Sequence, residues 1–411
     1  MHSTTAVYNH SVQANQTQKH LLLTIFNSIV IFSLVYCAIP KYFIGDPRII
    51  NIRLIVFPLI TVSLLAQLLL LLTLKRPSRI IFISYAIILY ASLLGFINFS
   101  NLYFTWKWFS IDMLSQFSFI AGLIFVQANG LQKTFSILTT VLIIILPLML
   151  LGFLTIFGDY AQMEYYGRAY DGSGFYIEFI MVLILPMFWL SLTKREHSKF
   201  KNKCIIVLGY LLCLIFSYIS ATKSTFLGLV VSSGLVCFFE YNRKVAIGLP
   251  LLILSSILVF INWDSLISSL GFLGHRLQTF DYNTEGRWVE LQDMTQQVGE
   301  YLIIGAGNGI GVYSSISAKI GTFYTNDLHV GLANFLLKGG VIGLFAILIP
   351  GIAGIIKIIA NKPNPLIQGS FTSLIAWYAM AATTSGYNSI SLFMLGIITQ
   401  VLFSQKTSSK Q

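Results

Sequence analysis

Four basic residues are candidates for binding an anionic ligand: Arg168, Lys223, Arg276 and Arg287. Arg287 falls in the first turn of a predicted helix, where the dipole disfavours a cation and the free backbone N–H groups attract an anion. A cation there suits a negatively charged ligand. Fixed cationic groups of this kind can hold a diphosphate by charge-assisted hydrogen bonds. Lys223 also has a simpler interpretation, as a side chain that extends from a helix end to the membrane surface.

His329 follows the sequence Asn-Asp-Leu at the predicted start of a helix. At an aqueous boundary, with Asp327 two residues earlier, it could act as a general base near neutral pH. A lone histidine on a helix is more often a hydrogen-bonded packing residue, and both interpretations stay open on these residues.

The segment GAGNGIG at 305–311 looks like a phosphate-binding loop only superficially. It does not match GxGxxG and follows no predicted strand, so we interpret it as a flexible loop. The four cysteines lie in apolar segments without CxxC or Cys/His spacing. We therefore predict no metal site, no disulfide framework and no cofactor.

The elements that must position these residues are set by composition. Of 411 residues, 56% are hydrophobic and only 10% are charged, and the mean hydropathy is +0.78. Soluble domains are about 45–50% apolar and about 25% charged. These values predict an all-α polytopic membrane protein and exclude a disordered or disulfide-rich secreted chain. Basic residues of membrane proteins collect in cytoplasmic loops, so the net charge of +11 is not taken as a sign of a nucleic-acid partner.

Runs of roughly 20 apolar residues, the length that spans the hydrocarbon as a helix, predict about twelve transmembrane helices. They begin near Leu21, Leu54, Ile80, Trp108, Ser136, Tyr176, Cys204, Thr225, Ala246, Leu328, Ile367 and Asn388. The fourth carries Asp112 near its start. The predicted regions are an N-terminal tail (1–20), helices one to nine (21–262), a large loop (263–327), helices ten to twelve (328–403) and a C-terminal tail (404–411).

Charge distribution predicts the orientation. With both termini in the cytoplasm, the cytoplasmic segments hold 16 of the 26 Lys and Arg residues, and only Glu196 and Glu240 of the 15 acidic ones. This is the bias of the positive-inside rule. The large loop 263–327 then faces the outside of the membrane, and within it NTEGRWVELQDMTQQVGEYLIIG (283–305) has helical spacing of apolar residues. We expect Asn283 or Thr284 to cap this helix and Gly305 to end it.

Several segments, in order, resemble the bacterial O-antigen ligase and polymerase superfamily. TKSTFLGLV (222–230) resembles its SR-G segment. HRLQTFD (275–281) and GRWVELQDMTQQVGEYLIIGAGNGIGVY (286–313) look like its Arg-containing periplasmic loop, and LHVGLANFLLKGGVIGLF (328–345) is similar to its HN-x-x-L…G-x-x-G-L segment. The chain departs from the pattern at Lys223, where the family usually has Arg, and at Val330, where an Asn commonly follows the His.

The resemblance implies a metal-independent, inverting glycosyltransferase of the bacterial inner membrane, with its site facing the periplasm and a role in lipopolysaccharide biosynthesis. Its donor would be a glycan linked to undecaprenyl diphosphate. In family terms Arg168, Lys223, Arg276 and Arg287 would hold the diphosphate, Arg287 also being catalytic. His329 would deprotonate or orient the acceptor hydroxyl. The acceptor would be lipid A-core for a ligase and the growing glycan for a polymerase.

The single dominant outside loop favours an O-antigen ligase, because polymerases of the superfamily often carry two sizeable periplasmic loops. A repeat-unit polymerase is the alternative. A lipid-linked sugar flippase or another twelve-helix transporter is the rival from another class, since it would share the predicted helix count. The lopsided loop 263–327 and the segment KRPSR (75–79), which lacks the Gly/Asp pattern of facilitator loops, argue against a transporter.

Overall fold

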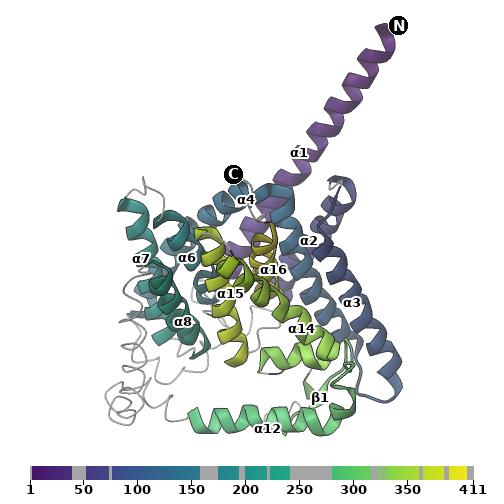
Figure 1. Ribbon diagram of the computed structural model, residues 1–411, viewed down its shortest axis with the longest axis vertical. Coiled ribbons are helices and arrows are strands. Elements are labelled where there is room, and N and C mark those ends of the chain that lie inside the picture. The colour runs from purple at the N-terminus through teal and green to yellow at the C-terminus, as the bar shows by residue number, and fades with distance from the viewer. Residues whose placement is uncertain are drawn as a thin grey trace.

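The computed structural model describes residues 2–38, 52–73, 76–157, 175–193, 200–219, 223–240, 280–315, 324–325, 328, 330–360, 364–383 and 388–404. These form the helices α1 (His2–Ala38), α2 (Ile52–Thr73), α3 (Arg79–Ile97), η2 (Asn98–Ser100), α4 (Trp106–Phe157), α6 (Phe175–Thr193), α7 (Phe200–Ile219), α8 (Lys223–Glu240), α12 (Phe280–Val298), η3 (Gly299–Tyr301), α14 (Gly331–Ala360), α15 (Pro365–Thr383) and α16 (Ser389–Ser404). Two short strands, β1 (Val312–Tyr313) and β2 (Tyr324–Thr325), pair antiparallel. Figure 1 shows the helices gathered in a bundle with α12 lying across one end.

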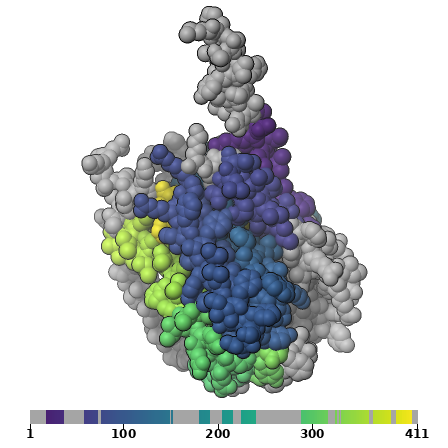
Figure 2. All heavy atoms as spheres, turned by 90° about the vertical axis from the view of Figure 1, so that its right-hand side faces the viewer, coloured from purple at the N-terminus to yellow at the C-terminus, as the bar shows by residue number. Residues whose placement is uncertain are grey.

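The described part of the chain is an all-α protein of membrane-spanning type. Four helices are long and apolar enough to cross a membrane: Thr17–Tyr36, Arg79–Ser100, Trp106–Leu148 and Gly331–Ile359. Shorter apolar helices accompany them, at Pro58–Leu72, Ile180–Leu190, Cys204–Leu214, Ser224–Phe239 and Ser389–Ser404. Large apolar side chains are exposed on the outer helices, among them Leu71 at 80% and Ile359 at 80%. Figure 2 shows the side of the molecule formed by α2 and α3. Outward apolar faces of this kind suit contact with lipid rather than water.

Most predicted helix starts agree with observed ones. Those near Leu54, Ile80, Trp108, Tyr176, Thr225, Ile367 and Asn388 lie within two residues of the first residue of a helix. The starts expected near Cys204 and Leu328 are four and three residues from the first residues of α7 (Phe200) and α14 (Gly331). Two differ more: α1 begins at His2 rather than near Leu21, and the helices expected from Trp108 and Ser136 form α4, which bends at Gly130 (φ 71°, ψ 166°). The predicted start at Ala246 lies outside the described residues. A count of twelve membrane spans therefore stays a prediction.

Helix α16 lies at the centre of the bundle. All its residues from Ile390 to Leu402 are buried. It packs closely on α4, since a Cβ at Gly122 would overlap the backbone of Phe393, and a Cβ at Gly396 would overlap that of Phe119. Small residues that let two backbones approach are typical of helix contacts within membranes.

Hydrogen bonds between helices define two ends of the bundle. At the first, which we call the basic end, Gln127 of α4 accepts the Ser78 N–H before α3, at 3.0 Å, and Ser78 Oγ donates to Gln400 of α16 at 3.3 Å. Lys357, near the end of α14, donates to the Leu402 carbonyl there. At the opposite end, which we call the loop end, Asn98 of η2 donates to the Ala306 carbonyl at 3.0 Å. Helix α3 therefore runs from the basic end to the loop end, and α14 and α16 end at the basic end.

Candidate functional site

The segment 305–311, which we call the glycine loop, is buried at the loop end of the bundle. The prediction that it is a flexible loop was therefore wrong. Its backbone groups have partners: the Asn308 N–H donates to Ala91 O at 2.9 Å and the Gly311 N–H to Tyr103 O at 2.9 Å. A buried loop is stable only when its polar backbone atoms are satisfied in this way.

The glycine loop inserts into a break in α14. Gly340 has a non-helical backbone (φ 62°, ψ −154°), so the hydrogen-bond ladder of the helix is interrupted there. The Ala306 N–H donates to Leu337 O at 2.7 Å, and the Val341 N–H donates to Ile303 O at 3.0 Å. In an unbroken helix Val341 would donate to Leu337. The backbone of Ile303 and Ala306 thus replaces one hydrogen bond of α14, and both freed groups are satisfied.

The glycine loop also crosses α3 at backbone contact. Gly307 has φ +102°, and a Cβ there would overlap the backbone of Gly95. A Cβ at Gly95 would in turn overlap the Asn308 carbonyl. Next to this crossing the amides of Asn308 and Gln116 exchange two hydrogen bonds, of 2.8 and 2.9 Å, and Asn308 Nδ2 also donates to Ser92 Oγ at 3.2 Å. Glycine is needed here both for its positive φ and for its missing side chain.

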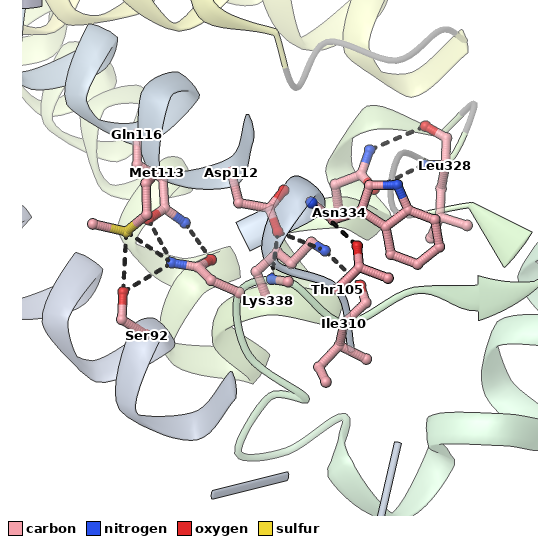
Figure 3. Close-up of polar contacts among 12 residues, drawn as sticks. Ser92, Thr105, Asp112, Met113, Gln116, Ile310, Leu328, Asn334 and Lys338 are labelled. Carbon is pink, nitrogen blue, oxygen red and sulfur yellow. Dashed lines mark hydrogen bonds and ion pairs between the residues drawn. The ribbon is translucent and has the colours of Figure 1, made fainter. Parts of the chain in front are cut away.

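A buried ion pair fixes the centre of the loop. Lys338 Nζ lies 2.9 Å from Asp112 Oδ2, and the two side chains are 2% and 0% exposed. Lys338 also donates to Ile310 O at 2.7 Å, while Asp112 Oδ2 accepts the Gly309 N–H at 2.8 Å (Figure 3). The pair therefore joins α4, α14 and the glycine loop. A buried charge is tolerated only when it is paired and hydrogen-bonded, as both charges are here.

Helix α12 is attached to the glycine loop through the residues that follow it. Gln297 accepts the Tyr313 N–H at 2.7 Å and donates to the Tyr313 carbonyl at 2.8 Å. Asp293 Oδ2 accepts both the N–H and the hydroxyl of Ser315, at 2.8 and 2.7 Å. Met294 and Glu290 of the same helix are buried. The amphipathic helix expected in this segment is thus observed, but it begins at Phe280 rather than after a cap at Asn283 or Thr284.

Position 328, next to the predicted base His329, is held by one side chain. Asn334 accepts the Leu328 N–H at 2.8 Å and donates to the Leu328 carbonyl at 3.0 Å. Both residues are 0% exposed. Replacing Asn334 by Leu should remove both bonds and leave two buried backbone groups without this partner, at a cost of about 1–3 kcal/mol. Hydrogen exchange measures this directly: the Leu328 amide should lose protection, whereas Asn101→Leu, at an exposed turn of the same end, should leave it unchanged.

The structure describes only part of the predicted site. Arg168, Arg276 and His329 lie outside the described residues. Lys223 is the first residue of α8. Arg287 is the eighth residue of α12, about two turns from its start, so the prediction that it lies in the first turn of the helix was wrong. The side chains of both residues lie outside the described part. Whether the four cations converge therefore stays a prediction.

Asp112 and Lys338 are the residues that sequence reasoning missed as a pair. The available signal was their presence as opposite charges within two apolar helices, because ionisable residues in membrane segments are usually paired or functional. The two opposite charges contact each other and the glycine loop backbone, so the pair can fix the position of the glycine loop and, through β1, that of α12. It makes the loop end a rigid surface on which a site can be built.

Among known proteins, no family model matches the chain, and no curated protein sequence matches it. The functional interpretation therefore depends on its own residues and their arrangement.

Proposed function

We propose that the chain is an integral-membrane glycosyltransferase of a bacterial inner membrane, acting at the periplasmic face. In this proposal it has a twelve-helix frame, with 263–327 as its large periplasmic loop. It transfers a glycan from undecaprenyl diphosphate to an acceptor hydroxyl on lipid A-core, as an O-antigen ligase does. Repeat-unit polymerisation by the same chemistry is the alternative within the family.

One observation supports this proposal most: α12, which carries Arg287, is fastened to the loop end of an apolar bundle. Other elements with predicted site residues begin at that end. Helix α14 begins two residues after position 329. Helix α8 begins at Lys223, and its Gly228 packs on Met380 near the end of α15. That end of α15 lies beside the start of α16, because Trp377 donates a hydrogen bond to Ser391. A helix that lies across one end of a membrane bundle suits a reaction between two lipid-linked substrates.

The proposed reaction is a single displacement at the sugar C1 with inversion. The bond from C1 to the phosphate oxygen breaks, and the acceptor oxygen forms the new bond as His329 takes its proton. Undecaprenyl diphosphate leaves with the electron pair of the broken bond. Arg168, Lys223, Arg276 and Arg287 stabilise the charge that develops on it, so no metal ion is required.

Replacing Arg287 or His329 by Ala should abolish measurable transfer, while the protein still inserts. Loss of one electrostatic contact to a developing charge costs about 10²–10³ in rate, and loss of a general base about 10²–10⁴. Arg76→Ala, at the basic end, is the matched control and should transfer normally. Normal transfer by both site variants would overturn the assignment of these residues.

A strain deleted for the gene tests the proposed activity. Lipopolysaccharide on gels should then be bare core, with full-length polymer accumulating on undecaprenyl diphosphate. Core carrying a single repeat unit would instead mean a polymerase. An unchanged ladder would contradict both activities.

The broken helix α14 favours a second candidate, a transporter of lipid-linked sugar. Discontinuous helices and buried ionisable residues near them are common at transporter binding sites. Purified protein distinguishes the two candidates: a transferase consumes the lipid-linked glycan, whereas a carrier in vesicles only moves it between leaflets.

A further inference from the structure

A cavity of about 300 Å³ opens between α3 and α14 on the outer surface of the bundle, with α4 and α16 at its back. Its rims are apolar and exposed: Ile83 is 56% exposed, Ile349 49% and Phe403 37%. In Figure 2, blue atoms of α3 and yellow-green atoms of α14 lie on either side, and yellow atoms of α16 are visible between them. Because these helices are of membrane-spanning type, we call this cavity the lipid-facing groove.

The length of the groove matches one leaflet of a bilayer. Along α3 it runs from Arg79, at the basic end, to Ala91. At 1.5 Å per residue that is about 18 Å, a little more than half of the roughly 30 Å hydrocarbon thickness. An extended acyl chain of a single leaflet fits this length.

The charges place a headgroup at the basic end. Arg79 lines the groove and is exposed. Lys357 lies over the ring of Phe403, 6.0 Å from its centroid, so a second cation is near the same mouth. In the helices that line the groove, α3, α4, α14 and α16, the one acidic residue is Asp112 of α4, which is paired with Lys338 at the opposite end. Basic pockets between membrane helices bind anionic lipid headgroups for this reason.

A polar side chain inside the groove supports the same orientation. Thr399 lines the groove, is 0% exposed, and its hydroxyl finds no hydrogen-bond partner among the described residues. It lies one helical turn from Phe403, about 6 Å deeper than the mouth. At that depth an ester carbonyl of a lipid would accept a hydrogen bond from this hydroxyl. At the inner end, by contrast, Lys338 is already engaged by Asp112 and Ile310.

We propose that the lipid-facing groove binds one acyl chain of an anionic phospholipid, with its phosphate at Arg79 and an ester carbonyl at Thr399. The site is separate from the proposed transfer site, which belongs to the opposite end of the bundle. It also differs from a polyprenyl donor site in length, since the groove accommodates little more than one leaflet.

Native mass spectrometry of the full-length protein, released from nanodiscs of phosphatidylglycerol and phosphatidylcholine, tests the proposal. Wild-type protein should retain one phosphatidylglycerol in preference to phosphatidylcholine. Arg79→Gln should weaken that preference about fivefold, the usual contribution of one basic side chain at a membrane surface. Arg76→Gln, an exposed cation at the same end that does not line the groove, should leave the preference unchanged.

Two further variants separate the groove from surface charge. Ile83→Trp and Ile349→Trp fill it from opposite walls and should each displace the bound lipid, with unfolding temperatures near that of wild type. Thr399→Val should weaken binding without altering the charge. Equal retention of both lipids, or retention unchanged in Arg79→Gln and in both Trp variants, would overturn the proposal. So would a polyprenyl phosphate or a second copy of the chain found in the groove.

Discussion

Replacing Lys338 by Met is expected to destabilise the folded protein by about 3–5 kcal/mol, the usual cost of removing one partner of a buried ion pair. Methionine fills a similar volume, so the loss is electrostatic rather than a cavity. Asp112 would keep a buried charge without its cation, and Ile310 O would lose its donor. Reversible unfolding in detergent measures the effect, and the glycine loop should become more accessible to protease.

A double-mutant cycle identifies the cause. Asp112→Asn keeps an acceptor for the Gly309 N–H, so Asp112→Asn with Lys338→Met leaves no buried charge. The double variant should be more stable than the sum of the two single losses predicts, by about 0.5–3 kcal/mol. Lys107→Met replaces an exposed lysine on α4, the helix that carries Asp112, and should change stability by no more than about 0.5 kcal/mol. Additive losses would show that the two charges are not coupled.

Replacing Gly307 by Ala is expected to cost about 4 kcal/mol or more, the range of the most damaging single substitutions. Two causes combine at this position. The backbone φ of +102° is strained for any residue with a side chain, and the new Cβ would overlap the backbone of Gly95. Neither backbone can move without opening the crossing between the glycine loop and α3. Folded yield and unfolding temperature in detergent report the loss.

Two other glycines are matched controls for Gly307→Ala. Gly130 has φ +71° but open space around its Cβ, so Gly130→Ala should cost only the strain, about 1–3 kcal/mol. Gly299 has open space and no positive φ, so Gly299→Ala should be nearly neutral. Gly95→Ala tests the same crossing from the other side: Gly95 has no positive φ, so this variant should lose stability through the overlap with the Asn308 carbonyl alone. Equal effects of Gly307→Ala and Gly130→Ala would mean that the backbones do not touch.

Apolar runs predicted where most of the described helices begin, because an apolar helix is a local property that length and hydropathy decide. How many of these helices span the membrane stays a prediction. The amphipathic pattern of α12 was equally readable, since Met294 and Val298 share a buried face. The start of α12 was not readable in the same way, because the helix begins at Phe280, three residues before Asn283, the predicted capping residue.

The site was less predictable because its contacts join distant parts of the chain. Glycines at 305–311 look flexible in the sequence, and only the partner backbones at Gly95 and Gly340 make them a tight crossing. Asp112 and Lys338 are far apart along the chain, so their pairing could be suspected from charge but not assigned. The break in α14 likewise follows from Gly340 only once the loop inserts there.

Transfer by purified protein is the most direct test of the proposed function. The protein is reconstituted with a glycan on undecaprenyl diphosphate and lipid A-core, without added metal, and both lipids are followed by mass spectrometry. We expect the glycan to appear on the core with equivalent release of undecaprenyl diphosphate, and His329→Ala to stop both. Donor that stays intact, or moves across the membrane unchanged, would contradict a glycosyltransferase.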